Sequence, residues 1–183
     1  MARTSPSVLI ALLLLALIAA PVSDQAQGQA LRPLSQALLK RLAELDAAID
    51  QATKSVQSAK VEDLKLSAQD RKFIEDSRAR TIRSAELVRK QTDVLRRRQT
   101  LQDLFALKSV LDGFERQLDA FASRVQRAEL RLEGDASAKA SIWLTVIERS
   151  SDTVEAAALA FDGEALDVLT KADNAISVRG DGR

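Results

Sequence analysis

The stretch LFALKSVLDGFERQLDAFASRVQRAELRL, residues 104–132, decides the fold of this chain. Its large apolar residues recur at alternating steps of three and four, the spacing of a helix that buries one face against other helices. This apolar seam comprises Leu104, Leu107, Leu111, Phe114, Leu118, Phe121, Val125, Ala128 and Leu132. Gly113 lies within it and costs about 1 kcal/mol of helix stability relative to Ala, but the unbroken seam predicts that the helix continues.

Two other segments share this pattern. Upstream, a helix is predicted over residues 33–60, and Pro33 stands where a helix can begin because its missing N–H is not needed there. Its seam is Leu34, Leu38, Leu42, Leu45, Ile49, Ala52, Val56 and Ala59. Downstream, a helix is predicted over residues 136–161, after a turn at Gly134 and Asp135. Its seam is Ala140, Trp143, Ile147, Ser150, Val154, Ala157 and Phe161.

The C-terminal part is expected to break at Asp162–Gly163, because aspartate and glycine together favour turns. A short helix over residues 164–177 would follow, either packing at one end of the bundle or extending the helix before it. Residues 179–183 are polar and are predicted to form a flexible tail. Within this tail Arg179, Gly180 and Asp181 match the integrin-binding tripeptide, a motif too short to carry an argument.

The weakest apolar pattern lies between the first two seams. Ser67 with Asp70 three residues later resembles a capping box and predicts a helix over residues 68–98. Thr100 and Asp103 form a second such pair, so this helix either ends there or continues into the next as one rod. Because the links between long helices are short, neighbouring helices are expected to be antiparallel. The predicted fold class is all-α: an up-and-down antiparallel bundle of about four long helices plus a short C-terminal helix, after an N-terminal signal helix.

The N-terminus has the features of a secretory signal peptide over residues 1–26. Arg3 supplies a positive charge, an uncharged apolar run follows over residues 8–20, and small or polar residues come after it. The run is shorter than the roughly 20 residues that a membrane-spanning helix needs. Cleavage is therefore expected near Ser23 or Ala26.

Export decides the expected compartment and domain organisation. The mature chain is predicted to be periplasmic or secreted, without a transmembrane span, and the alternative is an uncleaved N-terminal anchor in the inner membrane. Residues 27–178 would form one helical bundle domain. The chain has no Cys, so disulfides cannot stabilise this domain and helix packing must do so.

Composition excludes much catalytic chemistry. The chain has no His, Cys or Tyr, and its single Met is Met1. These absences exclude His-based acid–base catalysis, Cys nucleophiles, imidazole or thiolate metal sites and haem ligation by His or Met. No glycine-rich phosphate loop is present, and the predicted seams carry no acid, so the carboxylates are expected on the solvated surface. The chain is predicted to be non-enzymatic, with no catalytic, cofactor-binding or metal-binding residues and no cofactor.

Charge is unevenly distributed along a chain whose net charge is only +1. Residues 71–98 hold ten bases against four acids, whereas residues 134–178 hold three bases against eight acids. The basic segment predicts contact with an anionic partner, either a protein or an envelope component. The candidate contact residues are Arg89, Lys90, Arg96, Arg97 and Arg98. Nucleic acid is not an expected partner, because the compartment is wrong and residues 68–98 contain a single aromatic, Phe73.

Three alternatives concern the same basic segment. The first is a solvated helix whose acids and bases pair locally at i and i+4, as the spacings of Asp76–Arg80, Glu86–Lys90 and Asp93–Arg97 allow. Its excess charge also complements the acidic C-terminal helices, which would lie diagonally from it, and this predicts a salt-dependent antiparallel dimer. Finally, a row of small polar residues either lines a ligand groove or allows close helix packing. The row consists of Ser77, Thr81, Ser84 and Gln91.

These observations predict an exported helical-bundle protein that acts by interaction, as a periplasmic scaffold or adaptor. The alternative is a periplasmic module that binds a ligand or holds a client protein, in a chaperone-like manner, in a cavity between its helices.

Overall fold

Four long helices make up the described part of the chain. The structure, a computed structural model, describes the backbone of residues 34–180 and the side chains of residues 34–62 and 64–170. The helices are α2 (Gln36–Ser58), α3 (Ala68–Arg98), α4 (Leu101–Glu129) and α5 (Asp135–Gly180), with a short 3-10 helix η1 (Val61–Asp63) between α2 and α3. No strand occurs within these residues. The all-α prediction is confirmed, while the proposed signal peptide lies outside the described residues.

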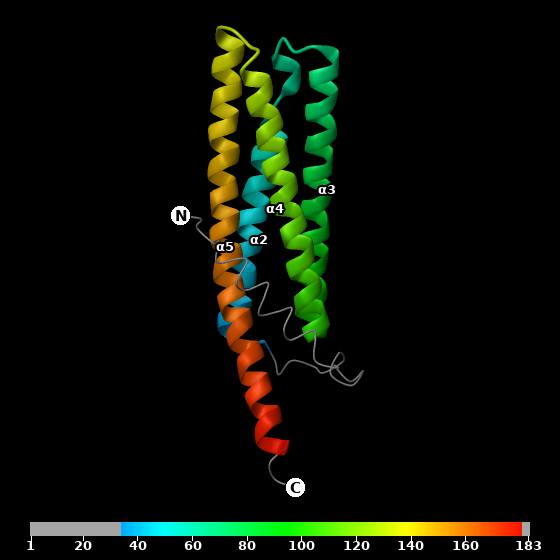
Figure 1. Ribbon diagram of the computed structural model, residues 1–183, viewed down its shortest axis with the longest axis vertical. Coiled ribbons are helices and arrows are strands. Elements are labelled where there is room, and N and C mark those ends of the chain that lie inside the picture. Colours follow the sequence, from blue (N-terminus) through cyan, green and yellow to red (C-terminus); the bar gives the residue numbers. More distant parts are fainter. Residues whose placement is uncertain (1–33, 181–183) are drawn as a thin grey trace, which may run out of the picture.

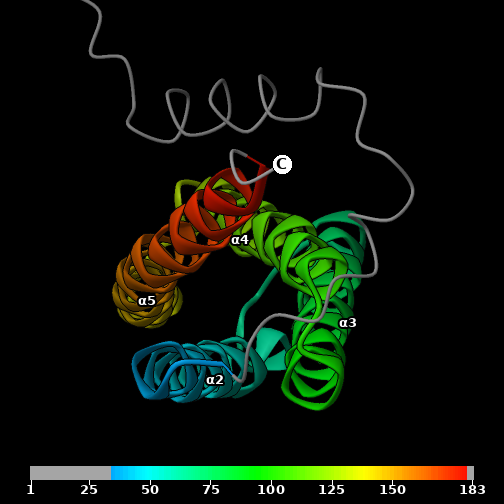
Figure 2. The same ribbon diagram turned by 90° about the horizontal axis from the view of Figure 1, so that it is seen from below.

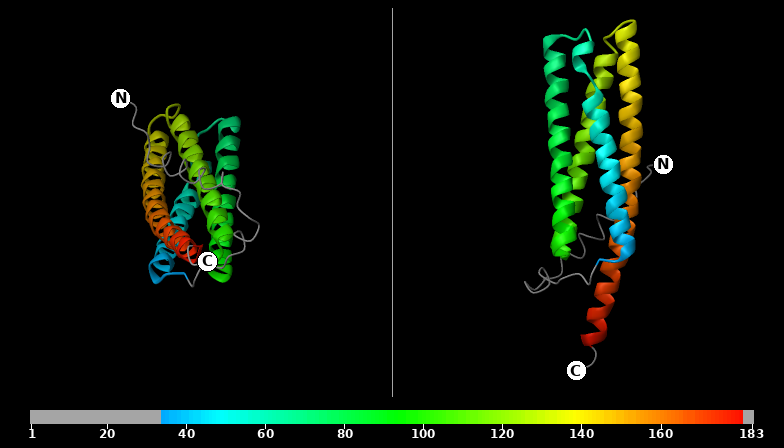
Figure 3. Two further views of the ribbon diagram at one scale, coloured as in Figure 1. Left: turned by 60° about the horizontal axis from the view of Figure 1, so that its bottom comes forward. Right: turned by 180° about the vertical axis from the view of Figure 1, so that it is seen from behind.

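The helices alternate in direction along the chain (Figure 1). Viewed along the bundle axis they form a ring in which each helix packs against its two neighbours, and α3 lies diagonally across from α5 (Figure 2). The C-terminal part of α5 runs past the ends of the other helices (Figure 3). An up-and-down bundle with short links therefore follows from the sequence as expected.

The two capping pairs set the starts of α3 and α4. The Ser67 hydroxyl accepts a hydrogen bond from the Asp70 amide at 3.0 Å, and the Thr100 hydroxyl accepts one from the Asp103 amide at 3.1 Å. Between these helices Gln99 adopts a left-handed conformation with φ 53°. A helix cannot continue through that backbone geometry, so of the two alternatives the single rod is wrong, and α3 and α4 are separate helices.

The first helix begins later than its sequence predicted. Ser35 is the N-cap of α2, and its hydroxyl accepts a hydrogen bond from the Leu38 amide at 3.1 Å. Ser satisfies a free amide of the first turn, which Pro33 cannot do because it has no side-chain acceptor. The helix ends at Ser58, and η1 then leads into α3.

The expected break at Asp162–Gly163 does not occur, because α5 runs through both residues. Phe161 and Ala165 flank Gly163 and are both buried on the face that α5 turns toward the core. The Asp162 carboxylate is held by Lys108 of α4. This packing outweighs the roughly 1 kcal/mol that a helical glycine costs. The separate helix over residues 164–177 is thus part of α5, and the first two residues of the predicted tail continue that helix.

The predicted seams form the core. Phe114 and Phe121 of α4 and Phe161 of α5 are fully buried and pack with the leucines of α2. Three seam positions differ, since Leu132, Trp143 and Ala157 are only half-buried, and Ala158 is buried beside Ala157. Within the described residues no helix is long and apolar enough to cross a membrane.

Small polar residues let α3 approach α4 closely. Ser77 and Thr81 are buried, and the Thr81 hydroxyl lies 3.0 Å from the carbonyl oxygens of both Ser77 and Gln117. Gln91 donates from its amide to the Asp103 carbonyl at 3.2 Å. These groups are used within the bundle, so the packing interpretation of this polar row is confirmed and the ligand-groove interpretation is not supported.

Alanine substitutions at two glycines test whether α5 is continuous. We expect Gly163→Ala to raise the free energy of unfolding by about 0.5–1 kcal/mol, because alanine favours helix and a Cβ there meets no atom within 4 Å. Gly134→Ala is the matched control and should lower it by about 1 kcal/mol, because Gly134 has φ +59°. Urea unfolding measures both. Destabilisation by Gly163→Ala would indicate a break at this position.

Candidate functional site

The five candidate cations divide into two groups. Arg89 and Arg96 lie half-buried on the side of α3 that meets α2. A guanidinium nitrogen of Arg89 lies 2.6 Å from the Asp50 carboxylate, and Arg96 forms an ion pair with Asp46. Both arginines therefore join α3 to α2. Their charges are thus engaged within the bundle, and a contact role for these two residues stays a prediction.

The other three cations face solvent. Lys90, Arg97 and Arg98 are exposed, and none forms an ion pair with a described residue. Arg97 donates from Nε to the Asp93 carbonyl of its own helix at 3.2 Å. All of the last-turn arginines also complement the negative end of the α3 dipole, which gives them a structural role besides any contact role.

The three i, i+4 ion pairs expected along α3 do not form within the described residues. The local pair on α3 is instead at i, i+3, where Arg96 lies 3.5 Å from Asp93. Arg80 donates to the Asp76 backbone carbonyl at 3.2 Å. Two bases of α3 are paired with acids of α2, and Arg78 donates to the Gln57 carbonyl of α2 at 2.7 Å.

Several carboxylates are less solvated than expected. Asp103 is only 6% exposed near the start of α4, and Asp46 and Glu115 are half-buried. Burial raises the pKa of Asp46 above its ordinary value, and the neighbouring Arg96 only partly opposes this. Burial, with repulsion from Asp112 and Glu155, raises the pKa of Glu115 to about 7. The prediction that acids are purely solvated is wrong at these positions.

Glu115 lies in an acidic groove of about 400 Å³ between α4 and α5. Its charged lining consists of Lys108, Asp112, Glu115, Arg116, Asp119, Glu155 and Asp162. Lys108 forms an ion pair with Asp162. No other cation that lines the groove pairs with Glu115. In the described part of the chain no three acidic side chains are placed to hold a metal ion. The groove therefore offers carboxylates without a coordination site.

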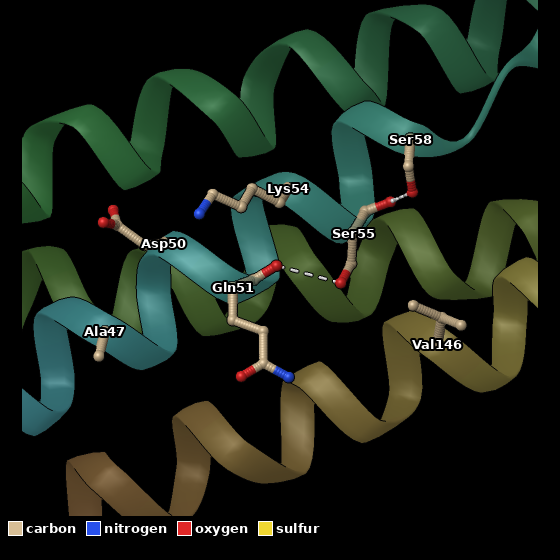
Figure 4. Close-up of a pocket in the computed structure, with 7 residues that line it drawn as sticks. All are labelled: Ala47, Asp50, Gln51, Lys54, Ser55, Ser58 and Val146. Carbon is tan, nitrogen blue, oxygen red and sulfur yellow. Dashed lines mark hydrogen bonds between the residues drawn. The ribbon is translucent and has the colours of Figure 1, made fainter.

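A second groove, of about 630 Å³, lies between α2 and α5 (Figure 4). Its serine hydroxyls are already hydrogen-bonded, since Ser55 donates to the Gln51 carbonyl at 3.0 Å and Ser58 donates to the Ser55 carbonyl at 2.8 Å. The Ser55 hydroxyl also meets that of Ser150 at 2.8 Å. Figure 4 shows Asp50 and Lys54 lying apart from these serines. No convergent set of reactive groups is formed there by the residues described.

Comparison with known proteins gives no family for this chain. No family model matches it, and neither a curated protein nor a solved structure matches it significantly. Its function must therefore be argued from the geometry above.

The Arg96–Asp46 pair should be coupled energetically. Removing Arg96 leaves a half-buried carboxylate without its cation, so a double-mutant cycle of Arg96→Gln and Asp46→Asn should show a coupling free energy of about 1 kcal/mol. The matched cycle of Lys90→Gln and Glu86→Gln should show almost none, because both side chains are exposed and they form no ion pair with each other. Urea unfolding measures both coupling free energies. Equal values in the two cycles would contradict the grouping of the cations into those that pair with α2 and those that face solvent.

Glu115 should make stability depend on pH. Its pKa rises from 4.5 to about 7 on folding, so the folded chain binds more protons and stability falls as pH rises between these values. We expect Glu115→Gln to melt above the wild type by several degrees at about pH 8, and the difference to disappear near pH 4. Glu148→Gln, an exposed acid of α5, is the control. A gain from Glu115→Gln that is independent of pH would contradict this cause.

Proposed function

We propose that this chain is an exported, non-enzymatic bundle protein that acts as a periplasmic scaffold or adaptor and binds an anionic partner through α3. The partner is a protein or an anionic component of the envelope. Export is inferred from the N-terminal sequence. The absence of His, Cys and Tyr supports a role by contact and not by catalysis.

The observation that carries this proposal is the exposure of Lys90, Arg97 and Arg98 after Arg89 and Arg96 have been neutralised by α2. Arg83, one helical heptad before Lys90, is exposed as well. Residues seven apart lie on nearly the same face of a helix, so Arg83, Lys90 and Arg97 form a row. Such a row attracts an extended anionic surface more strongly than isolated cations do.

The ligand-binding alternative has less support. The described pockets are open grooves between neighbouring helices. The interior beside α4 is filled by Phe114, Phe121 and the leucines of the seam. A client or ligand would thus have to bind on the outside of the bundle, where charge is the dominant feature of α3.

The ion pairs of α3 decide which variants can test this proposal. Replacing Arg96 would disturb the α2–α3 boundary, so loss of binding in such a variant would be ambiguous. Lys90, Arg97 and Arg98 can be changed together without removing an ion pair. A matched control changes Lys54, Lys139 and Arg149, which are also exposed but lie on α2 and α5.

We expect the Lys90→Glu/Arg97→Glu/Arg98→Glu variant to lose binding that the Lys54→Glu/Lys139→Glu/Arg149→Glu control retains. Two measurements are needed: cosedimentation with phosphatidylglycerol or phosphatidylcholine vesicles, and capture from an envelope extract. The wild type should bind the anionic vesicles or capture specific extract proteins, and binding should weaken as salt rises. If the two charge-reversed variants behave alike in both assays, α3 is not the contact surface.

A further inference from the structure

A basic groove lies at the end of the bundle where α3 begins and α4 ends. Figure 1 shows these two helix ends side by side. The groove measures about 490 Å³, and its polar and aromatic lining includes Ser67, Asp70, Phe73, Arg124, Arg127 and Arg131. Lys90, Arg97 and Arg98 lie in the second half of the same helix, so this groove is separate from the surface proposed above.

Arg124 and Arg127 lie on α4, and Arg131 lies in the turn that follows it. Arg131 lies 3.0 and 3.2 Å from the two carboxylate oxygens of Asp70. Arg124 stacks over the Phe73 ring, with its guanidinium carbon 5.8 Å from the ring centre. Arg127 is exposed and donates only from Nε, to the Ser123 carbonyl at 3.1 Å. The groove therefore holds three guanidinium groups against one carboxylate.

A structural role explains part of this arrangement. Cations in the last turns of a helix complement its dipole, and Asp70 also accepts a hydrogen bond from Ser67 at 2.8 Å. That role does not require an aromatic ring beside the cations. Phe73 is nevertheless 46% exposed in the same groove, which is a large apolar surface to leave in water.

We propose that this groove binds a phosphate monoester attached to a sugar or lipid headgroup. Guanidinium groups bind phosphate through paired, charge-assisted hydrogen bonds, and a doubly charged phosphate competes well with a single carboxylate. The phosphate displaces Asp70 from Arg131 and is held by Arg127 and Arg131. The exposed ring of Phe73 then supports the apolar face of the attached group.

Calorimetric titration of the purified chain tests the site. The ligands are glucose 1-phosphate, glucose and inorganic phosphate. We expect glucose 1-phosphate to bind and glucose not to bind. Arg127→Gln and Arg131→Gln should each lower the affinity about tenfold, the loss of one charge-assisted contact. Phe73→Leu should weaken glucose 1-phosphate more than inorganic phosphate. Arg149→Gln on α5, an exposed arginine away from the groove, is the control.

Asp70→Asn provides the opposite test. It removes the competing charge while keeping the amide at the start of α3, so affinity for phosphate should rise severalfold. Cosedimentation with phosphatidic acid vesicles distinguishes a lipid headgroup from a soluble sugar phosphate, and either source supports the site. The proposal is overturned if no phosphate monoester binds, if Asp70→Asn weakens binding as Arg131→Gln does, or if the groove variants match Arg149→Gln. Circular dichroism confirms that each variant is folded.

Discussion

The apolar seam of α4 is the element on which the rest of the bundle depends. Phe114, Leu118 and Phe121 are fully buried at its centre, and the chain has no disulfide to substitute for their packing. Replacing one such side chain with alanine lowers the free energy of unfolding by roughly 2–5 kcal/mol, because a cavity remains. That is a large part of the total stability of a domain of this size. The ion pairs and hydrogen bonds between the other helices form only because packing on this seam brings those helices together.

The boundary between α2 and α3 is held differently. Near this boundary the buried face of α3 carries Thr92 beside Asp46 of α2, and a threonine contributes less apolar burial than a leucine would. Arginines at the edge of that face reach over to acids and carbonyls of α2. Partly exposed ion pairs stabilise by roughly 1 kcal/mol or less each, so this boundary is the one most sensitive to salt. The arginines at this boundary hold α3 against α2, so fewer of the cations of α3 are free to contact a partner.

Sequence periodicity was sufficient to predict the helices but not their partners. The start of α3 follows from Ser67 and Asp70, because a cap is a local interaction, whereas its end was left open by the sequence and is set by the left-handed backbone of Gln99. The break at Gly163 was predicted wrongly, because the packing of Phe161 and Ala165 is a long-range effect that outweighs a local turn preference.

The roles of Arg89 and Arg96 required knowledge of which helix lies beside α3. A sequence signal did exist, since Asp46, Asp50, Thr53 and Gln57 follow one another at helical steps along one edge of α2. These are the groups that meet Arg96, Arg89 and Arg78. Similarly, Arg124 and Arg127 of α4 and Arg131 in the turn after it lie close together in the sequence, but only the fold brings Phe73 beside them. The burial of Glu115 had no such signal, because it depends on how closely α5 approaches.

The diagonal placement of α3 and α5 bears on self-association through their opposite charges. In a two-fold dimer each copy presents the same surface to the other. The outer faces of diagonal helices point in opposite directions, so one contact cannot pair α3 with α5 twice. An antiparallel dimer of the kind expected from charge alone is therefore disfavoured by this geometry. Pairing of α3 with α5 of a second copy would leave one α3 and one α5 free, which leads to head-to-tail association and not to a closed pair.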